Sequence, residues 1–211
     1  MASVISVNVG KPSPIPRQSA VSAIDKRSVS GPVGVRPLGL VGDDQADKVN
    51  HGGLEQALYA YATEDLEGWA TMLERDLRPG EFGENLSTRG VDVTGAAIGE
   101  IWHIGTAVLQ VSRPRIPCVV FQNWLGEPHW VKRFTEDGRS GAYLRVLESG
   151  ELSAGDEIVI DGRPDHGVTI GLTFRALTTD RTLMPRLLDA PQLPADLYAL
   201  AGLYAGRMRT D

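Results

Sequence analysis

The residues best suited to chemistry lie in one short stretch, residues 110–118, which reads Gln-Val-Ser-Arg-Pro-Arg-Ile-Pro-Cys and ends in the only cysteine of the chain. Each proline fixes its own φ and disfavours helix in the residue before it, so Cys118 should follow a stiff, extended turn. The guanidinium groups of Arg113 and Arg115 favour a thiolate, which suits a soft metal with sulfur ligands. The alternative is an inert cysteine packed as a small hydrophobic side chain.

Two glycine-containing loops carry further polar groups that could contact a ligand. They read Asn50-His51-Gly52-Gly53 and Phe82-Gly83-Glu84-Asn85. Glycine lets the backbone approach a ligand closely, the Asn85 amide can donate and accept, and His51 can change charge near neutral pH. Together with the arginine forks and the thiol, these loops suit an anionic organometallic cofactor. Ordinary turns, a helix start and surface ion pairs remain the alternatives.

The elements expected to position these residues are mostly strands. Residues 107–111 should form a strand that leads into the thiol stretch, within a hairpin over 98–112. Alternation or short apolar runs predict further strands at 4–9, 21–24, 33–40, 54–61, 91–93, 141–147 and 157–160. Residues 64–73 have helical spacing with Thr63 as the expected N-cap, and the chain should turn helical after Cys118. The 24 glycines and 13 prolines also favour a turn-rich, mainly β body.

Composition excludes several classes of protein. One cysteine among 211 residues permits no internal disulfide and no four-cysteine zinc site, so a reducing, cytoplasmic location is expected. A net charge of −6 argues against general affinity for nucleic acid. The N-terminus lacks the pattern of a signal peptide, and no run is long enough for a membrane span. No serine-hydrolase, Walker or dinucleotide-binding motif is present.

Taken together in order, these motifs resemble the MOSC domain, named after the C-terminal part of molybdenum cofactor sulfurases. The resemblance rests on His51-Gly52-Gly53, the loop of residues 80–86, and Pro114-Arg115-Ile116-Pro117-Cys118, with support from residues 42–47, 98–100, 141–147 and 155–156. It covers nearly the whole chain and points to stand-alone bacterial members of the YiiM type. It implies a mainly β fold with helices, with a β-barrel-like MOSC core over residues 1–165. A three-helix appendage would follow over residues 166–211, where three segments of helical spacing are separated by prolines.

The resemblance also implies a site for the molybdenum cofactor, a molybdenum ion held by molybdopterin. In the family the cysteine is the protein ligand to molybdenum, and Cys118 occupies that position. His51 would line the pocket near the metal, as a ligand orienter or proton donor. The residues expected to bind the cofactor are Lys26, Gly52, Gly53, Phe82, Gly83, Glu84, Asn85, Ser112, Arg113 and Arg115.

Related proteins reduce N-hydroxylated compounds such as N-hydroxylaminopurines, so the resemblance implies a molybdenum-dependent oxidoreductase. Because one cysteine cannot ligate an iron–sulfur cluster, electrons would come from a separate reductase. Nucleic acid and membrane are not expected partners. Two alternatives remain: a carrier that holds sulfur or the cofactor on Cys118 without turnover, and a structural or regulatory binding domain with an inert cysteine.

Overall fold

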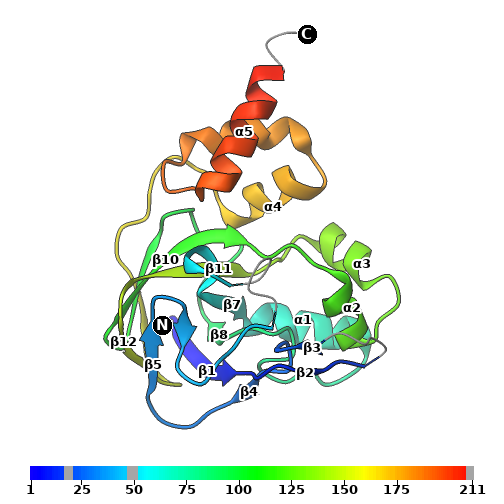
Figure 1. The fold of residues 1–211 in the computed structure, drawn as a ribbon, viewed down its shortest axis with the longest axis vertical. Coiled ribbons are helices and arrows are strands. Elements are labelled where there is room, and N and C mark those ends of the chain that lie inside the picture. Colours follow the sequence, from blue (N-terminus) through cyan, green and yellow to red (C-terminus); the bar gives the residue numbers. More distant parts are fainter. Residues whose placement is uncertain (17–20, 47–51, 208–211) are drawn as a thin grey trace.

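The computed structural model describes residues 1–16, 21–46 and 52–207 as a mixed α/β fold (Figure 1). Its strands are β1 (Ser3–Val9), β2 (Ser13–Pro14), β3 (Val21–Ser22), β4 (Arg27–Ser28), β5 (Val33–Arg36), β6 (Gly39–Leu40), β7 (Leu58–Ala62), β8 (Leu86–Arg89), β9 (Ile101–Ile104), β10 (Ala107–Pro114), β11 (Ala142–Glu148), β12 (Gly150–Leu152) and β13 (Ile158–Ile160). Its helices are η1 (Leu54–Gln56), α1 (Thr63–Leu73), α2 (Val119–Leu125), α3 (Trp130–Asp137), α4 (Ile170–Thr178), η2 (Arg181–Asp189) and α5 (Ala195–Arg207). None of these helices is long and apolar enough to cross a membrane.

The body of the molecule is one large sheet, with strand order β13-β9-β10-β11-β7-β8-β1-β4. The sheet is not closed into a barrel, because β1 and β13 form no strand ladder in the described residues. One isolated bridge, Ser3–Glu157, and three backbone hydrogen bonds between residues 2–4 and 155–158 join the two edges. Residues Asn8 and Val9 of β1 pair instead with β4. Closure needs a continuous, staggered ladder all round. The expected β-barrel-like core is therefore wrong: strand patterns predict the strands but not whether the two edges pair.

Four neighbouring strands bring their ends together at one side of this sheet. The C-terminal end of β10 pairs with the start of β11, with Arg113 opposite Tyr143, and Tyr143 is in turn opposite Tyr59 near the start of β7. Strand β7 runs parallel to β8, which begins at Leu86 opposite Ala60. A parallel pair needs a crossover, and α1 supplies it. Segments distant in sequence therefore meet at this end of the sheet.

The three C-terminal helices α4, η2 and α5 pack above β10 and β11 in Figure 1. One hydrophobic cluster joins them to the sheet. It contains Leu109 and Leu144 from the strands, and Ala176 and Leu197 from the helices. The middle segment, η2, is a 3-10 helix that contains Pro185. Helical structure after residue 166 is thus confirmed, while the proposed domain division stays a prediction.

A second hydrophobic cluster is aromatic and packs α1, α2 and α3 against the start of β7. Its centre is Phe82, whose ring centroid lies 5.0 Å from Tyr61, 5.1 Å from Phe121 and 5.4 Å from Trp130. Edge-to-face contacts of this kind add specificity to apolar burial. The cluster therefore fixes the loop that carries Phe82 against the helix that follows Cys118.

Most predicted elements near the sheet are confirmed, and the differences are local. Helix α1 begins at Thr63 itself, whose hydroxyl donates to the Thr88 carbonyl instead of capping the helix. Residues 91–93 form turns instead of an edge strand, and residues 54–56 form the 3-10 helix η1 before β7. Short apolar runs do not separate strand from 3-10 helix, because both bury similar side chains.

Candidate functional site

A cavity of about 250 Å³ opens at the side of the sheet where β7, β8, β10 and β11 meet. Its apolar walls come from the β3 segment and α2, and include Val21, Ala23, Ile24 and Val120. Tyrosine rings and a small set of charged and amide side chains complete it: Lys26, Asp44, Gln45, Gln56, Tyr59, Asn85, Arg115, Cys118 and Tyr143. Mostly apolar walls with a few polar groups are typical of small-molecule sites.

Cys118 lines this cavity and precedes α2 as its N-cap residue, with φ −132° and ψ 171°. Earlier in the same stretch, Pro114 predicts an extended Arg113, and Arg113 does lie in strand β10. The thiol is partly exposed, so it is not sealed in the core. The Cys118 backbone carbonyl accepts the first hydrogen bond of α2, from the Gln122 N–H at 3.1 Å. Its position is therefore set by backbone on both sides while its side chain opens to the cavity.

Arg115 is a buried cation in the same cavity, with 7% of its surface exposed. It donates a hydrogen bond to the Phe82 carbonyl, and its guanidinium carbon lies 3.8 Å from the centroid of the Phe121 ring. Among the described residues, no carboxylate lies within ion-pair distance of it. A buried charge without a counter-ion is costly. The cavity is therefore prepared for an anion beside Cys118.

Lys26 is also buried, but it already has a partner. Its ammonium lies 2.5 Å and 2.6 Å from the two carboxylate oxygens of Asp43. Burial lowers the pKa of Lys26, and the neighbouring Asp43 carboxylate opposes that shift. Asp43 also accepts from the Gly10 N–H at 2.7 Å and from the Asn85 amide at 2.9 Å. The pair adds little net charge to the cavity.

The Asn85 side chain is fully occupied by the protein. Its oxygen accepts from the Tyr59 N–H at 3.1 Å, and its nitrogen donates to Asp43 and to the Asn8 carbonyl at 3.2 Å. With both donors and its acceptor engaged, this amide ties β1, β7 and the Asp43 segment together. In this arrangement Asn85 shapes the cavity without a free polar group to offer a ligand.

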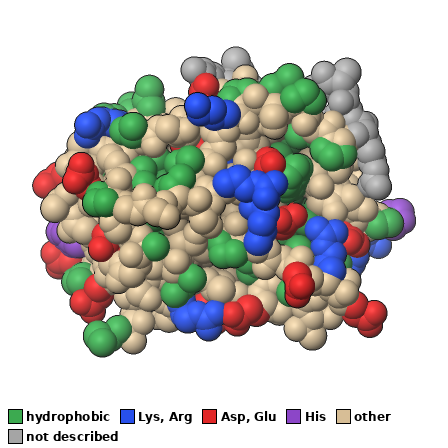
Figure 2. Space-filling view, turned by 90° about the horizontal axis from the view of Figure 1, so that it is seen from below, with side chains coloured by type: hydrophobic (Ala, Val, Ile, Leu, Met, Phe, Trp, Pro, Cys, Tyr) green, Lys and Arg blue, Asp and Glu red, His purple; other side chains and the backbone are tan. Residues whose placement is uncertain are grey.

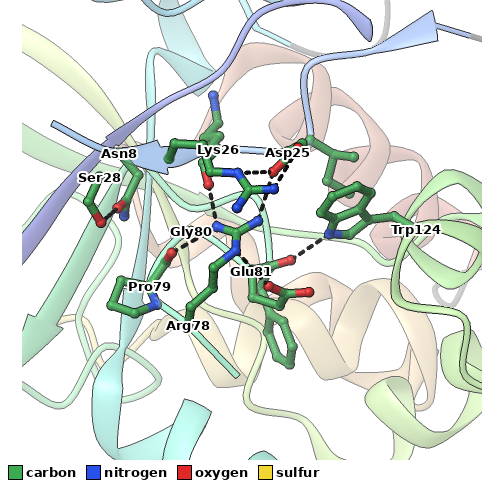
Figure 3. Close-up of polar contacts among 12 residues, drawn as sticks. Asn8, Asp25, Lys26, Ser28, Arg78, Pro79, Gly80, Glu81 and Trp124 are labelled. Carbon is green, nitrogen blue, oxygen red and sulfur yellow. Dashed lines mark hydrogen bonds and ion pairs between the residues drawn. The ribbon is translucent and has the colours of Figure 1, made fainter. Parts of the chain in front are cut away.

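Arg78 holds the backbone of the Lys26 segment from outside the cavity, as Figure 3 shows. Its guanidinium donates to the Lys26 carbonyl at 2.5 Å and to the Asp25 carboxylate at 2.7 Å. It also lies 3.1 Å from the Glu81 carboxylate. The Trp124 indole donates to the Glu81 carbonyl at 2.8 Å, which links α2 to the same loop.

The loop from Gly80 to Asn85 is held by the buried carboxylate of Glu84. This carboxylate accepts from the Gly80 N–H at 2.5 Å, the Phe82 N–H at 3.0 Å and the Ser87 hydroxyl at 2.8 Å. Burial raises the pKa of Glu84, and the hydrogen bonds from Gly80 and other donors oppose the rise. Gly80 has φ +82°, and a Cβ there would lie 2.5 Å from the Lys26 carbonyl oxygen. The loop therefore packs directly on the Lys26 segment.

The structure brings six of the predicted site residues to the cavity and places five elsewhere. The six are Lys26, Gly52, Gly83, Asn85, Arg115 and Cys118. Phe82 lies in the aromatic cluster, Glu84 binds its own loop, and Ser112 donates to the Glu55 carbonyl at 2.5 Å. Arg113 pairs with Asp196 of α5 at 3.1 Å, and Gly53 borders a second hollow. His51 lies outside the described residues. The functional roles assigned to all of these stay predictions.

Sequence reasoning missed several polar residues that line the cavity, among them Gln45, Gln56, Tyr59 and Tyr143. Tyr143 lies in a segment predicted as a strand and used as support for the family resemblance, but not as a site residue, and Gln56 lies in a run predicted as a strand. Their positions depend on pairing between β11 and β7, which no local pattern encodes. A polar side chain within an apolar run was the only available signal for both.

Charges on the outer surface are mixed. Figure 2 shows Lys and Arg side chains lying next to Asp and Glu side chains, with hydrophobic side chains between them. Ion pairs such as Arg27–Asp25 and Arg75–Glu127 account for part of this pattern. Among the described residues that line the cavity, Arg115 is a buried cation without a carboxylate partner.

A comparison with protein families agrees with this geometry. The MOSC domain profile matches residues 47–159, which carry the glycine loops, the arginines and Cys118. The chain belongs to the MOSC domain family. In this MOSC protein, the matched region supplies β7 to β11 and α2, the elements that meet around the cavity.

Relatives and solved structures place this MOSC protein near YiiM. Protein YiiM of Escherichia coli (strain K12) is 35% identical over 154 residues, covering 71% of this chain and 68% of that protein. The crystal structure of YiiM from Geobacillus stearothermophilus superposes with a TM-score of 0.80 at 28% identity, covering 97% of this chain and 99% of that one. A Gibberella moniliformis protein named "Reductase" is 34% identical over 182 residues, covering 84% of this chain. The match spans only 32% of that fungal protein.

Proposed function

We propose that the cavity binds the molybdenum cofactor through Cys118 and that the protein reduces N-hydroxylated compounds such as N-hydroxylaminopurines. One observation carries the proposal: the only cysteine of the chain opens into the same cavity as Arg115, a buried cation without a carboxylate partner among the described residues. Membership of the MOSC family and the name of the fungal relative support the reductase assignment.

The donor set of the cavity fits this cofactor. Among the described residues, no group of three or more His, Cys, Asp or Glu side chains could hold a bare metal ion. Cys118 could supply one sulfur ligand, so a metal bound there would have to arrive with its other ligands already attached. Arg115 provides a fork for an anionic group, and the walls of Tyr59, Tyr143 and Ile24 suit a planar ring.

Each cavity residue has a defined part in this proposal. Cys118 would ligate the metal, and the backbone on both sides would keep its sulfur in place. Arg115 would bind the anionic part of the cofactor while its ring contacts hold the guanidinium still. The Lys26–Asp43 pair and Asn85 would keep the opposite wall in shape. Gly83, with φ +75°, lets the loop pass close to Ile24.

When bound, the cofactor would supply the two-electron chemistry of R–NHOH + 2e⁻ + 2H⁺ → R–NH₂ + H₂O. In this reaction the N–O bond breaks, the nitrogen gains hydrogen, and the oxygen leaves as water. The protein would orient the N-hydroxyl group, exclude bulk water with its apolar walls and provide hydrogen-bond donors. Electrons would come from a separate reductase, because one cysteine cannot hold an iron–sulfur cluster.

The test is reduction of an N-hydroxylaminopurine by protein produced in a host that makes the cofactor, with dithionite-reduced viologen as electron donor. The wild type is expected to contain molybdenum and pterin and to form the aminopurine, whereas Cys118→Ala is expected to lose at least nine-tenths of the activity. Full activity in Cys118→Ala would contradict the proposal. A persulfide on Cys118 of the wild type without turnover would favour the carrier alternative instead.

A further inference from the structure

Most polar side chains in the cavity are already bound to the protein. The Tyr59 hydroxyl donates to the Ser140 carbonyl at 2.8 Å, and Lys26 and Asn85 are occupied as described above. The Tyr143 hydroxyl and the Gln56 amide differ, because neither has a hydrogen-bond partner in the part of the chain that the structure describes. Tyrosine hydroxyls in enclosed positions usually have a partner. Within the described residues, no protein group therefore occupies these two side chains.

The backbone segments that carry Gln56 and Tyr143 are held together by Ser112. The Ser112 hydroxyl lies 2.5 Å from the Glu55 carbonyl and 3.0 Å from the Tyr143 carbonyl. It thereby ties η1, which ends at Gln56, to the strand that carries Tyr143. Both residues line the cavity that contains Cys118. Ser112 itself does not line it, so its contribution is to hold this pair together.

The Tyr143 ring is held in place. Its centroid lies 5.2 Å from that of Tyr59, which is itself fixed by the bond to Ser140. Tyr143 lines the same cavity as Arg115 and Cys118. A fixed phenol is a better hydrogen-bond donor to a ligand than a mobile side chain, because less conformational freedom is lost on binding.

We propose that Tyr143 and Gln56 hold the substrate: the Tyr143 hydroxyl donates to the oxygen of the N-hydroxyl group, and the Gln56 amide binds the nitrogen-containing edge of the ring beside it. The inference rests on the proposed function and adds the residues that recognise its substrate. An amide offers both a donor and an acceptor, as the edge of a purine requires. Tyr143 contacts the oxygen that distinguishes substrate from product.

The experiment measures binding in the absence of turnover. Oxidised, molybdenum-loaded protein is titrated by calorimetry, without reductant, with 6-N-hydroxylaminopurine and with adenine. The wild type is expected to bind the hydroxylated compound more tightly. Tyr143→Phe is expected to lose about 2- to 10-fold of that preference, the range of one neutral hydrogen bond. Gln56→Met is expected to weaken both ligands by a similar factor and leave the preference intact.

Tyr61→Phe is the matched control. It removes a buried hydroxyl from β7, the strand next to β11, and this hydroxyl accepts a hydrogen bond from Trp69 and does not line the cavity. It should keep the wild-type preference. Equal molybdenum contents in all variants exclude a loading defect. If Tyr143→Phe keeps the full preference while the wild type reduces the substrate, the inference is overturned and the proposed function stands. A wild type that holds no molybdenum overturns both.

Discussion

Arg115 is a buried positive charge that, among the described residues, contacts a carbonyl and aromatic rings but no carboxylate. Such a charge is retained at a cost in stability, and the cost is offset when an anion binds. We therefore interpret Arg115 as a residue that contributes to ligand binding more than to the stability of the fold. Asn85 is the opposite case, a side chain predicted for ligand recognition whose hydrogen bonds are all internal.

Replacing Arg115 tests the first of these assignments. Arg115→Met should lower the molybdenum content of protein made in a cofactor-producing host by at least 10-fold, because the anionic group loses a buried cation that has no carboxylate partner among the described residues. The metal-free protein should change in free energy of unfolding by no more than about 1 kcal/mol, since the lost hydrogen bond is balanced by relief of charge burial. Molybdenum analysis and urea unfolding measure both quantities. Unchanged molybdenum content would refute the assignment.

Replacing Asn85 tests the second. Asn85→Leu removes one hydrogen bond each from the Tyr59 N–H, the Asn8 carbonyl and the Asp43 carboxylate, which keeps its contact with Lys26. The free energy of unfolding should fall by about 2–4 kcal/mol, because buried polar groups lose hydrogen bonds. Urea unfolding gives the value, with Asn123→Leu on the partly exposed α2 as control, expected within about 0.5 kcal/mol of wild type. Equal effects of the two substitutions would show that the internal network contributes nothing.

At the scale of elements, the loop from Gly80 to Asn85 links the aromatic cluster, the Lys26 segment and the cavity. A glycine in this loop can be needed for close packing as well as for a positive φ, unlike a glycine on an open turn. Gly80 and Gly31 both have positive φ, +82° and +77°, but only at Gly80 would a Cβ meet another part of the chain, the Lys26 carbonyl at 2.5 Å. Comparing alanine substitutions at these two glycines therefore separates the cost of a positive φ from the cost of a steric contact.

Gly80→Ala should therefore destabilise the protein more than Gly31→Ala. The left-handed conformation costs each variant about 1–2 kcal/mol, and the contact with Lys26 should add about 1–2 kcal/mol to Gly80→Ala alone. Thermal unfolding of the two variants at equal concentration gives the comparison. Equal losses would mean that the loop does not press on the Lys26 segment.

Local sequence patterns predict several strands and helices correctly, but they predict the arrangement of the site only in part. Alternation predicts β1, β10 and β11, and prolines predict the extended approach to Cys118. The open edge of the sheet, the internal use of Asn85 and the availability of Tyr143 do not follow, because each depends on which distant strands lie side by side. The functions of motif residues came from resemblance, and the hydrogen-bond network separates those that line the cavity from those that support it.

At the scale of the whole molecule, one hydrophobic cluster spans the sheet and the C-terminal helices. Two polar contacts reinforce the junction: Arg113 pairs with Asp196, and Arg145 donates to the Gln192 carbonyl at 2.9 Å. Arg145 also lies 2.5 Å from the Glu55 carboxylate, next to Gln56. The C-terminal helices are thus connected through strand residues to a wall of the cavity.

This shared core predicts a single unfolding transition. All four tryptophans lie between residues 69 and 130, so their fluorescence reports on the sheet and its adjoining helices, whereas far-ultraviolet circular dichroism also reports on α4 and α5. Urea transitions followed by the two signals should coincide. A separate, earlier loss of helical signal would show instead that the C-terminal helices unfold on their own.

The central claim, that Cys118 is a ligand to the metal of the cofactor, is tested most directly by X-ray absorption at the molybdenum edge. Wild-type protein and Cys118→Ser, each loaded in a cofactor-producing host, are compared for the number of sulfur atoms bound to molybdenum. The account predicts one sulfur fewer per molybdenum in Cys118→Ser. An identical sulfur count in the two proteins would contradict it.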